Sequence, residues 1–128
     1  MTPRELDALV AEKVMGLPVL GEHHGEGDYV FQNGVGDLVG YQSVPHYSTS
    51  IAAAMEIVSK MGRWHGFDFV AMFIEDLWDK SKPPSWEAGW YEQSHDGYEA
   101  RTAANSDVLA KAICLAALKA VGVEVPHE

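Results

Sequence analysis

The stretch that decides the fold is Phe69-Val70-Ala71-Met72-Phe73-Ile74. Apolar residues occupy its odd and even positions alike, whereas a strand with one wet face alternates between apolar and polar residues. This pattern is typical of a strand that the rest of the protein covers on both faces. We therefore expect residues 69–74 to form a central strand of the sheet.

Two more strands are expected after this stretch. In residues 86–91, Trp86, Ala88 and Trp90 alternate with other residues in the period of two that strands follow. His95-Asp96-Gly97 predicts a hairpin turn, after which residues 98–103 return with charged side chains on one face. The sequence thus predicts a mostly antiparallel sheet.

Helical spacing of apolar residues marks three further segments. Residues 3–15 follow a capping box that begins at Thr2. A second helix should end at Gly62, with hydroxyl caps offered by Tyr47-Ser48-Thr49. Its expected stripe consists of Ile51, Met55, Val58 and Met61, with Ala52 and Ala54 alongside.

The third helix should begin after a cap at Asn105 or Ser106 and end at Gly122. Its apolar stripe consists of Leu109, Ile113, Ala116, Ala117 and Leu118. We expect the single cysteine, Cys114, to be a packed core residue of this helix, since a small buried thiol is ordinary there. Three helices and a mostly antiparallel sheet define an α+β fold.

The segment from Leu17 to Pro45 is rich in glycine and has no helical period. Asn33-Gly34 is a turn signal between residues 28–32 and 38–42, which predicts a short irregular hairpin. With 128 residues, the chain is long enough for one core and too short for two. We expect a single domain over 1–128 with a variable insertion at about 17–45.

Charge and composition narrow the class of partner. The formal net charge of −10 disfavours DNA and RNA, whose binding relies on lysine and arginine. The chain lacks a run of the ~20 apolar residues that a membrane-spanning helix needs. It opens without a secretion signal, and one cysteine cannot form an intrachain disulfide. We expect a cytosolic protein that binds neither nucleic acid directly nor a membrane.

Metal, cofactor and catalytic motifs are not visible in the sequence. Glu22-His23-His24, with Glu26 and Asp28 nearby, is better explained as a solvated loop, because adjacent histidines of an extended chain point in opposite directions. The acidic residues Glu75, Asp76 and Asp79 have no diagnostic spacing and are expected to be a hydrated strand end. Gly34-Val35-Gly36 is not followed by the lysine of a P-loop. We predict no metal and no cofactor.

The tryptophans and tyrosines are numerous for a domain of this size, and those left exposed would mark a contact surface. Trp78 and Trp86 flank the loop that contains Pro83 and Pro84. The glycine-rich segment and its end add three more candidates for ligand or partner binding, Tyr41, His46 and Tyr47.

Three segments resemble blocks of the phage ABA sandwich domain family, namely residues 5–16, 47–55 and 112–120. The resemblance implies layers of helix, sheet and helix, an α/β/α sandwich, and a variable glycine-rich segment. It implies no site residues, because the matching blocks are core patterns of helices.

The resemblance implies a phage or prophage accessory protein, which we expect in the cytoplasm of the bacterial host. We expect it to bind, without catalysis, a protein partner or its own copy as a homo-oligomer. One alternative is counter-defence by sequestration of a small signalling nucleotide, which needs an exposed aromatic pocket with basic side chains. Another alternative is an enzyme, a hydrolase or transferase, whose site is not visible in the sequence. Convergence of His46, Asp68 and Glu75 in one cleft would favour it.

Overall fold

Within residues 1–22, 29–34 and 40–125, which the computed structural model describes, the chain forms three α-helices and six β-strands. The strands pair antiparallel in two sheets, ordered β1-β2-β3 and β4-β5-β6, which confirms the predicted α+β class. In chain order the elements are α1 (Pro3–Lys13), β1 (Val19–Glu22), β2 (Tyr29–Asn33), β3 (Gly40–Ser43), α2 (Ile51–Met61), the short 3-10 helix η2 (Trp64–Gly66), β4 (Asp68–Ile74), β5 (Ser85–Ser94), β6 (Gly97–Ser106) and α3 (Leu109–Ala120).

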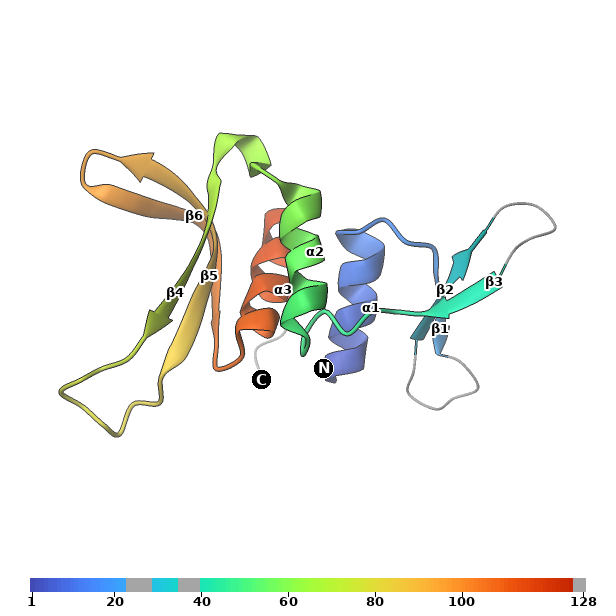
Figure 1. Cartoon of the computed structure of the whole chain (residues 1–128), viewed down its shortest axis with the longest axis horizontal. Coiled ribbons are helices and arrows are strands. Elements are labelled where there is room, and N and C mark those ends of the chain that lie inside the picture. The colour runs from blue at the N-terminus through green and yellow to red at the C-terminus, as the bar shows by residue number, and fades with distance from the viewer. Residues whose placement is uncertain (23–28, 35–39, 126–128) are drawn as a thin grey trace.

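The helices lie between the two sheets, as Figure 1 shows. Helix α3 packs on β5 and β6, α1 and α2 pack on α3, and α1 also contacts β1 and β2. The sequence suggested helices on both faces of one sheet. The strands instead divide into two sheets, because the glycine-rich segment forms a small sheet of its own beyond α1.

Helix α3 forms the centre of the core, and Ile113, Cys114 and Leu118 are fully buried, as the sequence predicted. The hydroxyl of Thr102 on β6 donates to the carbonyl of Ala116 at 3.0 Å and ties the helix to the sheet. The predicted cap is wrong, because β6 continues through Asn105 and Ser106, and Val108 precedes the first helical residue instead.

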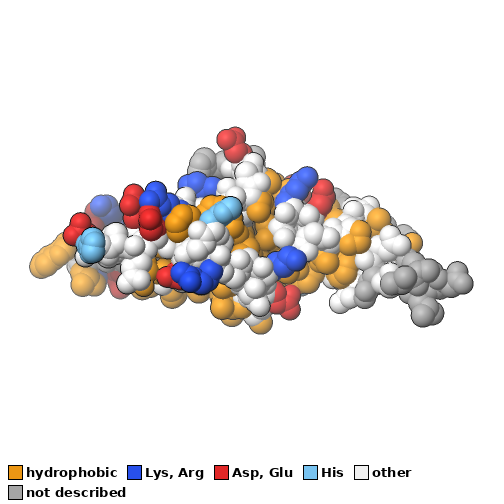
Figure 2. Space-filling model, turned by 90° about the horizontal axis from the view of Figure 1, so that it is seen from above, with side chains coloured by type: hydrophobic (Ala, Val, Ile, Leu, Met, Phe, Trp, Pro, Cys, Tyr) orange, Lys and Arg blue, Asp and Glu red, His pale blue; other side chains and the backbone are white. Residues whose placement is uncertain are grey.

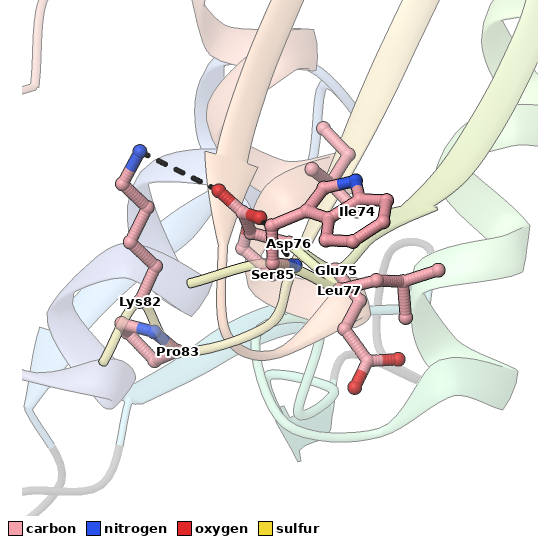
Figure 3. Close-up of a pocket in the computed structure, with 8 residues that line it drawn as sticks. Ile74, Glu75, Asp76, Leu77, Lys82, Pro83 and Ser85 are labelled. Atoms are coloured by element: carbon pink, nitrogen blue, oxygen red, sulfur yellow. Dashed lines mark hydrogen bonds and ion pairs between the residues drawn. The ribbon is translucent and has the colours of Figure 1, made fainter. Parts of the chain in front are cut away.

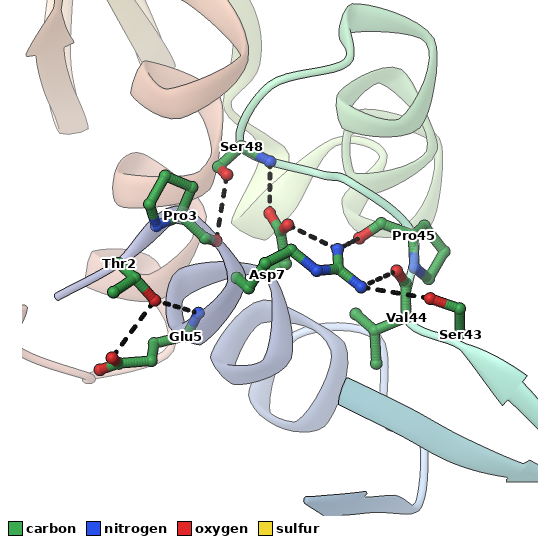
Figure 4. A network of polar contacts seen from close by, with 9 residues as sticks. Thr2, Pro3, Glu5, Asp7, Ser43, Val44, Pro45 and Ser48 are labelled. Carbon is green, nitrogen blue, oxygen red and sulfur yellow. Dashed lines mark hydrogen bonds and ion pairs between the residues drawn. The ribbon is translucent and has the colours of Figure 1, made fainter. Parts of the chain in front are cut away.

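Helix α1 is held at its start by a polar network (Figure 4). The side chain of Thr2 accepts the backbone N–H of Glu5 at 3.1 Å, as the capping box predicts. The buried carboxylate of Asp7 accepts from the guanidinium of Arg4 at 2.8 Å and from the backbone N–H of Ser48 at 2.7 Å. Arg4 also donates to the carbonyl of Val44 at 2.7 Å, so this network joins α1 to the chain that leads into α2.

Helix α2 departs from its predicted cap and stripe. The side chain of Ser50 caps it by accepting the backbone N–H of Ala53 at 3.3 Å. The backbone N–H of Ser48 instead donates to the carboxylate of Asp7. The buried residues are Ala54 and Ile57. Of the predicted stripe, Val58 and Met61 pack half-buried against the core, whereas Ile51 and Met55 are exposed. The helix end at Gly62 is confirmed, with a φ of 55° there.

The hairpin of β2 and β3 is confirmed, with Asn33 paired to Gly40. Asn33 is therefore the last residue of a strand, and the connection is longer than the tight turn that Asn33-Gly34 suggested. Residues 35–39, like residues 23–28, lie outside the described part of the chain. The predicted turn at His95-Asp96 is confirmed, because Ser94 pairs with Gly97 across it.

The position predicted for residues 69–74 is wrong. They do form a strand, but β4 lies at the edge of its sheet and β5 occupies the centre. Residues 71–74 are exposed, because the helices cover the sheet mainly over β5 and β6. A stretch with the composition of a buried strand thus lies at the surface of the single chain.

Candidate functional site

Strand β4 presents apolar side chains on both of its faces. Phe69 and Phe73 pack against Trp90 and Trp86, with ring centroids 5.5 and 5.1 Å apart. This is the face toward the helices, because the indole N–H of Trp90 donates to the carbonyl of Gly62 at the end of α2. Strand alternation places the neighbouring residues of β4 on the opposite face.

The loop after β4 carries the most exposed apolar side chains at this end of the molecule. Trp78 is 98% exposed and Leu77 is 67% exposed. Figure 2 shows hydrophobic side chains gathered at the end of the molecule where Figure 1 places this loop. We call Met72, Phe73, Ile74, Leu77 and Trp78 together the β4 surface.

Two aspartates hold the loop in its conformation. The carboxylate oxygen Oδ1 of Asp76 accepts the backbone N–H groups of Trp78 at 2.9 Å and of Asp79 at 3.0 Å. Asp79 in turn accepts the backbone N–H and the hydroxyl of Ser81. The bond from the N–H of Asp79 is the main cause that lowers the pKa of Asp76, and the hydroxyl of Ser81 does the same for the pKa of Asp79. The sequence predicted a solvated strand end here, and the structure adds this turn.

A hollow lies beside the loop and is bordered by Ile74, Trp78 and Pro83 (Figure 3). Its charged residues pair with one another, since the amine of Lys82 lies 3.6 Å from the carboxylate of Asp76. The amine of Lys80 lies 3.9 Å from the carboxylate of Glu75. With an exposed tryptophan and internally balanced charges, the hollow suits a largely apolar contact.

A second hollow of about 1450 Å³ lies between the start of α1 and helix α3. Lys111 and Lys119 line it together with small and apolar residues such as Leu115 and Val123. Its described lining contains no aromatic ring. The hollow at Trp78 does combine a ring with a lysine, but the amine of Lys82 already pairs with the carboxylate of Asp76.

The five candidate residues from the sequence do not form one site. Trp78 is exposed and belongs to the β4 surface. Trp86 is half-buried and packs against Phe73 of the same surface. Tyr41 is exposed on β3 in the other sheet, and His46 is exposed in the loop before α2. Tyr47 is buried with an exposed fraction of 1%, and burial raises its pKa to about 12. Tyr47 is therefore part of the hydrophobic core.

His46, Asp68 and Glu75 do not converge in one cleft. Asp68 begins β4 and Glu75 follows its end, so a rise of ~3.3 Å per residue separates them by roughly 23 Å. Among the described residues, no three His, Cys, Asp or Glu side chains are grouped as a metal site. The candidates at residues 23–28 lie outside that part of the chain, and the side chain of Glu22 is likewise not described.

Sequence reasoning missed most of the β4 surface, namely Met72, Phe73, Ile74 and Leu77. A continuous apolar run has the same composition whether the protein or a partner covers it. One signal was available in the pattern Asp76-Leu77-Trp78-Asp79, where side chains that favour turns flank two large apolar residues.

The fold and this surface together define a small α+β domain with an open apolar strand edge. A sequence profile for the phage ABA sandwich domain matches residues 8–118, so the chain belongs to that family. The crystal structure of a phage protein from Bacillus cereus ATCC 14579 has the same fold, with a TM-score of 0.58 and 21% identity. The match covers 98% of this chain and 93% of that one. No curated protein matches the chain. None of the helices in the described ranges is long and apolar enough to cross a membrane.

Proposed function

We propose that this phage-family protein acts by binding, without catalysis, and that the β4 surface is where a protein partner docks. The observation that carries the proposal is the exposure of Trp78 at the end of an apolar strand edge. Tryptophan is enriched among residues that dominate binding energy, and a large exposed apolar patch is unusual on a protein without a partner. The proposed location is the cytoplasm of the bacterial host.

The conformation of the loop supports this assignment. Asp76 holds the backbone on both sides of the indole, so that Trp78 is presented outward before any partner arrives. A loop backbone ordered in advance loses less entropy on binding, which favours affinity. No described strand pairs with the outer edge of β4, whose backbone groups a partner strand can bind.

Protein binding is preferred to nucleotide sequestration because of the charges at the site. Glu75 and Asp76 line the hollow beside Trp78, and the one cation among its described lining residues, Lys82, already pairs with Asp76 at 3.6 Å. A phosphate group would find no unpaired cation in this lining and would be repelled by the carboxylates. A folded polypeptide with apolar side chains meets no such repulsion.

The test compares matched alanine variants in affinity capture from phage-infected cells, followed by binding measurements with the purified captured protein. Leu77→Ala and Trp78→Ala should each weaken binding by about ten-fold or more, as truncation of central contacts does. Leu20→Ala is the control, because Leu20 is 54% exposed on β1 in the other sheet. Ile113→Ala, in the core, should unfold the domain instead.

The proposal fails if both loop variants bind as tightly as the wild type. It also fails if Leu20→Ala or Tyr41→Ala, on the other sheet, abolishes binding while the protein remains folded. Thermal melting of every variant separates loss of binding from loss of structure.

A further inference from the structure

The edge of β4 lacks the features by which proteins protect edge strands from pairing. Natural edges are blunted by lysine, by proline, by a bulge or by a covering loop. Residues 69–74 contain neither charge nor proline, and the pairing of β4 with β5 runs from Asp68 to Ile74 without a register shift. No described segment pairs with the other edge of β4. This edge is regular, apolar and open.

We infer that β4 of a second copy of this chain pairs antiparallel with β4, which gives a six-stranded sheet in the order β6-β5-β4-β4-β5-β6. The inference rests on the proposed function and names its partner. A two-fold axis brings the same patch of both copies together, and identical strands related in this way run antiparallel. In the pair, β4 becomes a central strand, which is the position that its apolar residues at both odd and even positions predict.

The strand is complementary to itself. Pairing centred on Ala71 sets Phe69 of each copy opposite Phe73 of the other, and Val70 opposite Met72. Aromatic and branched apolar residues in directly opposed positions stabilise antiparallel strands. Only apolar side chains meet between residues 69 and 73.

The charges at the two ends of β4 also allow a second copy of the chain to bind there, although each chain carries a net charge of −10. Arg63 pairs with Asp68 at one end, with the side-chain nitrogen Nε 3.2 Å from the carboxylate. Lys80 and Lys82 pair with Glu75 and Asp76 at the other end. A patch balanced within one chain does not require an oppositely charged partner and does not repel its own copy. Salt, which screens the remaining repulsion between the chains, should strengthen the pair or leave it unchanged.

The experiment measures molar mass by sedimentation equilibrium over a range of concentrations at low and high salt. We expect the wild type to approach twice the chain mass of 14.0 kDa. Met72→Lys should give the monomer, with a dissociation constant raised by about ten-fold or more, because lysine is a device that blocks edge pairing. Met55→Lys is the matched control, since Met55 on α2 is 46% exposed and Met72 is 39% exposed.

Amide hydrogen exchange supplies a second measurement that does not depend on any variant. In an edge strand the outward N–H groups exchange quickly, whereas in a central strand both sets are paired and slow. The outward amides of residues 69–74 should therefore be protected at high concentration and lose protection on dilution.

Several outcomes overturn the inference. A wild type that stays monomeric at every concentration, or a dimer that Met55→Lys dissociates and Met72→Lys does not, contradicts it. So do β4 amides whose protection is independent of concentration. If the monomer still binds a different protein through Leu77 and Trp78, the second copy is the wrong partner and the proposed function stands.

Discussion

The backbone N–H of Trp78 donates to the carboxylate oxygen Oδ1 of Asp76 at 2.9 Å, so one acidic side chain holds the backbone at the most exposed aromatic residue. Side chains of this type stabilise turns by accepting N–H groups two and three residues further along. Asp76 does both, because the N–H of Asp79 donates to the same oxygen at 3.0 Å.

Asp76→Ala should therefore loosen the loop without unfolding the domain. We expect the amide of Trp78 to exchange faster and binding through the β4 surface to weaken. Asp76→Asn keeps an oxygen acceptor in the same place and should restore most of the protection. Equal exchange rates in the wild type and Asp76→Ala would show that the carboxylate does not order the loop.

The same bond predicts a dependence on pH. The pKa of Asp76 is lowered in the fold, so the ionised carboxylate stabilises the loop. This stabilisation is complete above the ordinary aspartate pKa of about 3.9 and is lost as the pH falls through the lower folded pKa. The order of the loop should thus be constant near neutral pH and decrease only in acid. Asp76→Asn should not show this acid transition, and its exchange profile provides the control.

The sequence predicted the elements of this fold better than their surroundings. Periodicity located three helices and the strands around His95-Asp96, since these patterns depend on local geometry. It failed for α2, where Ile51 and Met55 are more hydrophobic than the Ala54 that is buried. Helix α2 packs on α3, and a close approach of two helices favours a small residue such as Ala54 at the contact. The local pattern of α2 cannot predict this contact, because α3 lies far away in the sequence.

The same limit applies to the candidate site. The sequence indicates Trp78 because a tryptophan that flanks a proline-containing loop is conspicuous by residue type. Phe73 and Ile74 were assigned to the core because their composition fits a buried strand. The part of a sheet that the helices leave uncovered depends on the lengths of elements far away in the sequence. It therefore cannot be predicted from residues 69–74 alone.

Asp7→Ala should be among the most destabilising changes at a polar residue of this protein. It removes a buried carboxylate that binds the guanidinium of Arg4 and the N–H of Ser48. Breaking a buried ion pair typically costs about 3–5 kcal/mol. Glu12→Ala in the same helix removes an exposed contact with Lys13 and should cost less than about 1 kcal/mol.

Urea denaturation of both variants measures these free energies of unfolding. Asp7→Asn should lie between Asp7→Ala and the wild type, because the amide oxygen can still accept from Ser48 while the charge opposite Arg4 is lost. If Asp7→Ala and Glu12→Ala are equally stable, the network does not join α1 to the chain before α2.

Gly89 in β5 should not tolerate even a methyl group. A Cβ atom there would lie 2.0 Å from the carbonyl oxygen of Thr102 and 2.6 Å from the Cα of Ala103, both in the backbone of β6. We expect Gly89→Ala to cost about 3 kcal/mol, the upper end for overpacking, since strands cannot move apart without losing their pairing. Ala100→Val, at an exposed position of β6, is the control and should change stability by about 0.5 kcal/mol or less. A Gly89→Ala protein as stable as the wild type would contradict the close approach of β5 and β6.

Cys114 should be chemically inert until the domain unfolds. The residue is fully buried in α3, and burial raises the pKa of its thiol above the ordinary range. The thiolate is the reactive form, so a thiol reagent should not label the native protein at neutral pH and should label it fully in denaturant. An exposed cysteine introduced by Ala100→Cys in the Cys114→Ser background should react at once and provides the control.

Cys114→Ser should lower stability by about 1–3 kcal/mol, because it places a hydroxyl in an apolar site, and should leave binding through the β4 surface unchanged in the folded fraction. Thermal melting and the binding measurement are made on the same preparation. Rapid labelling of the native thiol, or lost binding by a fully folded Cys114→Ser protein, would assign this cysteine a function beyond packing.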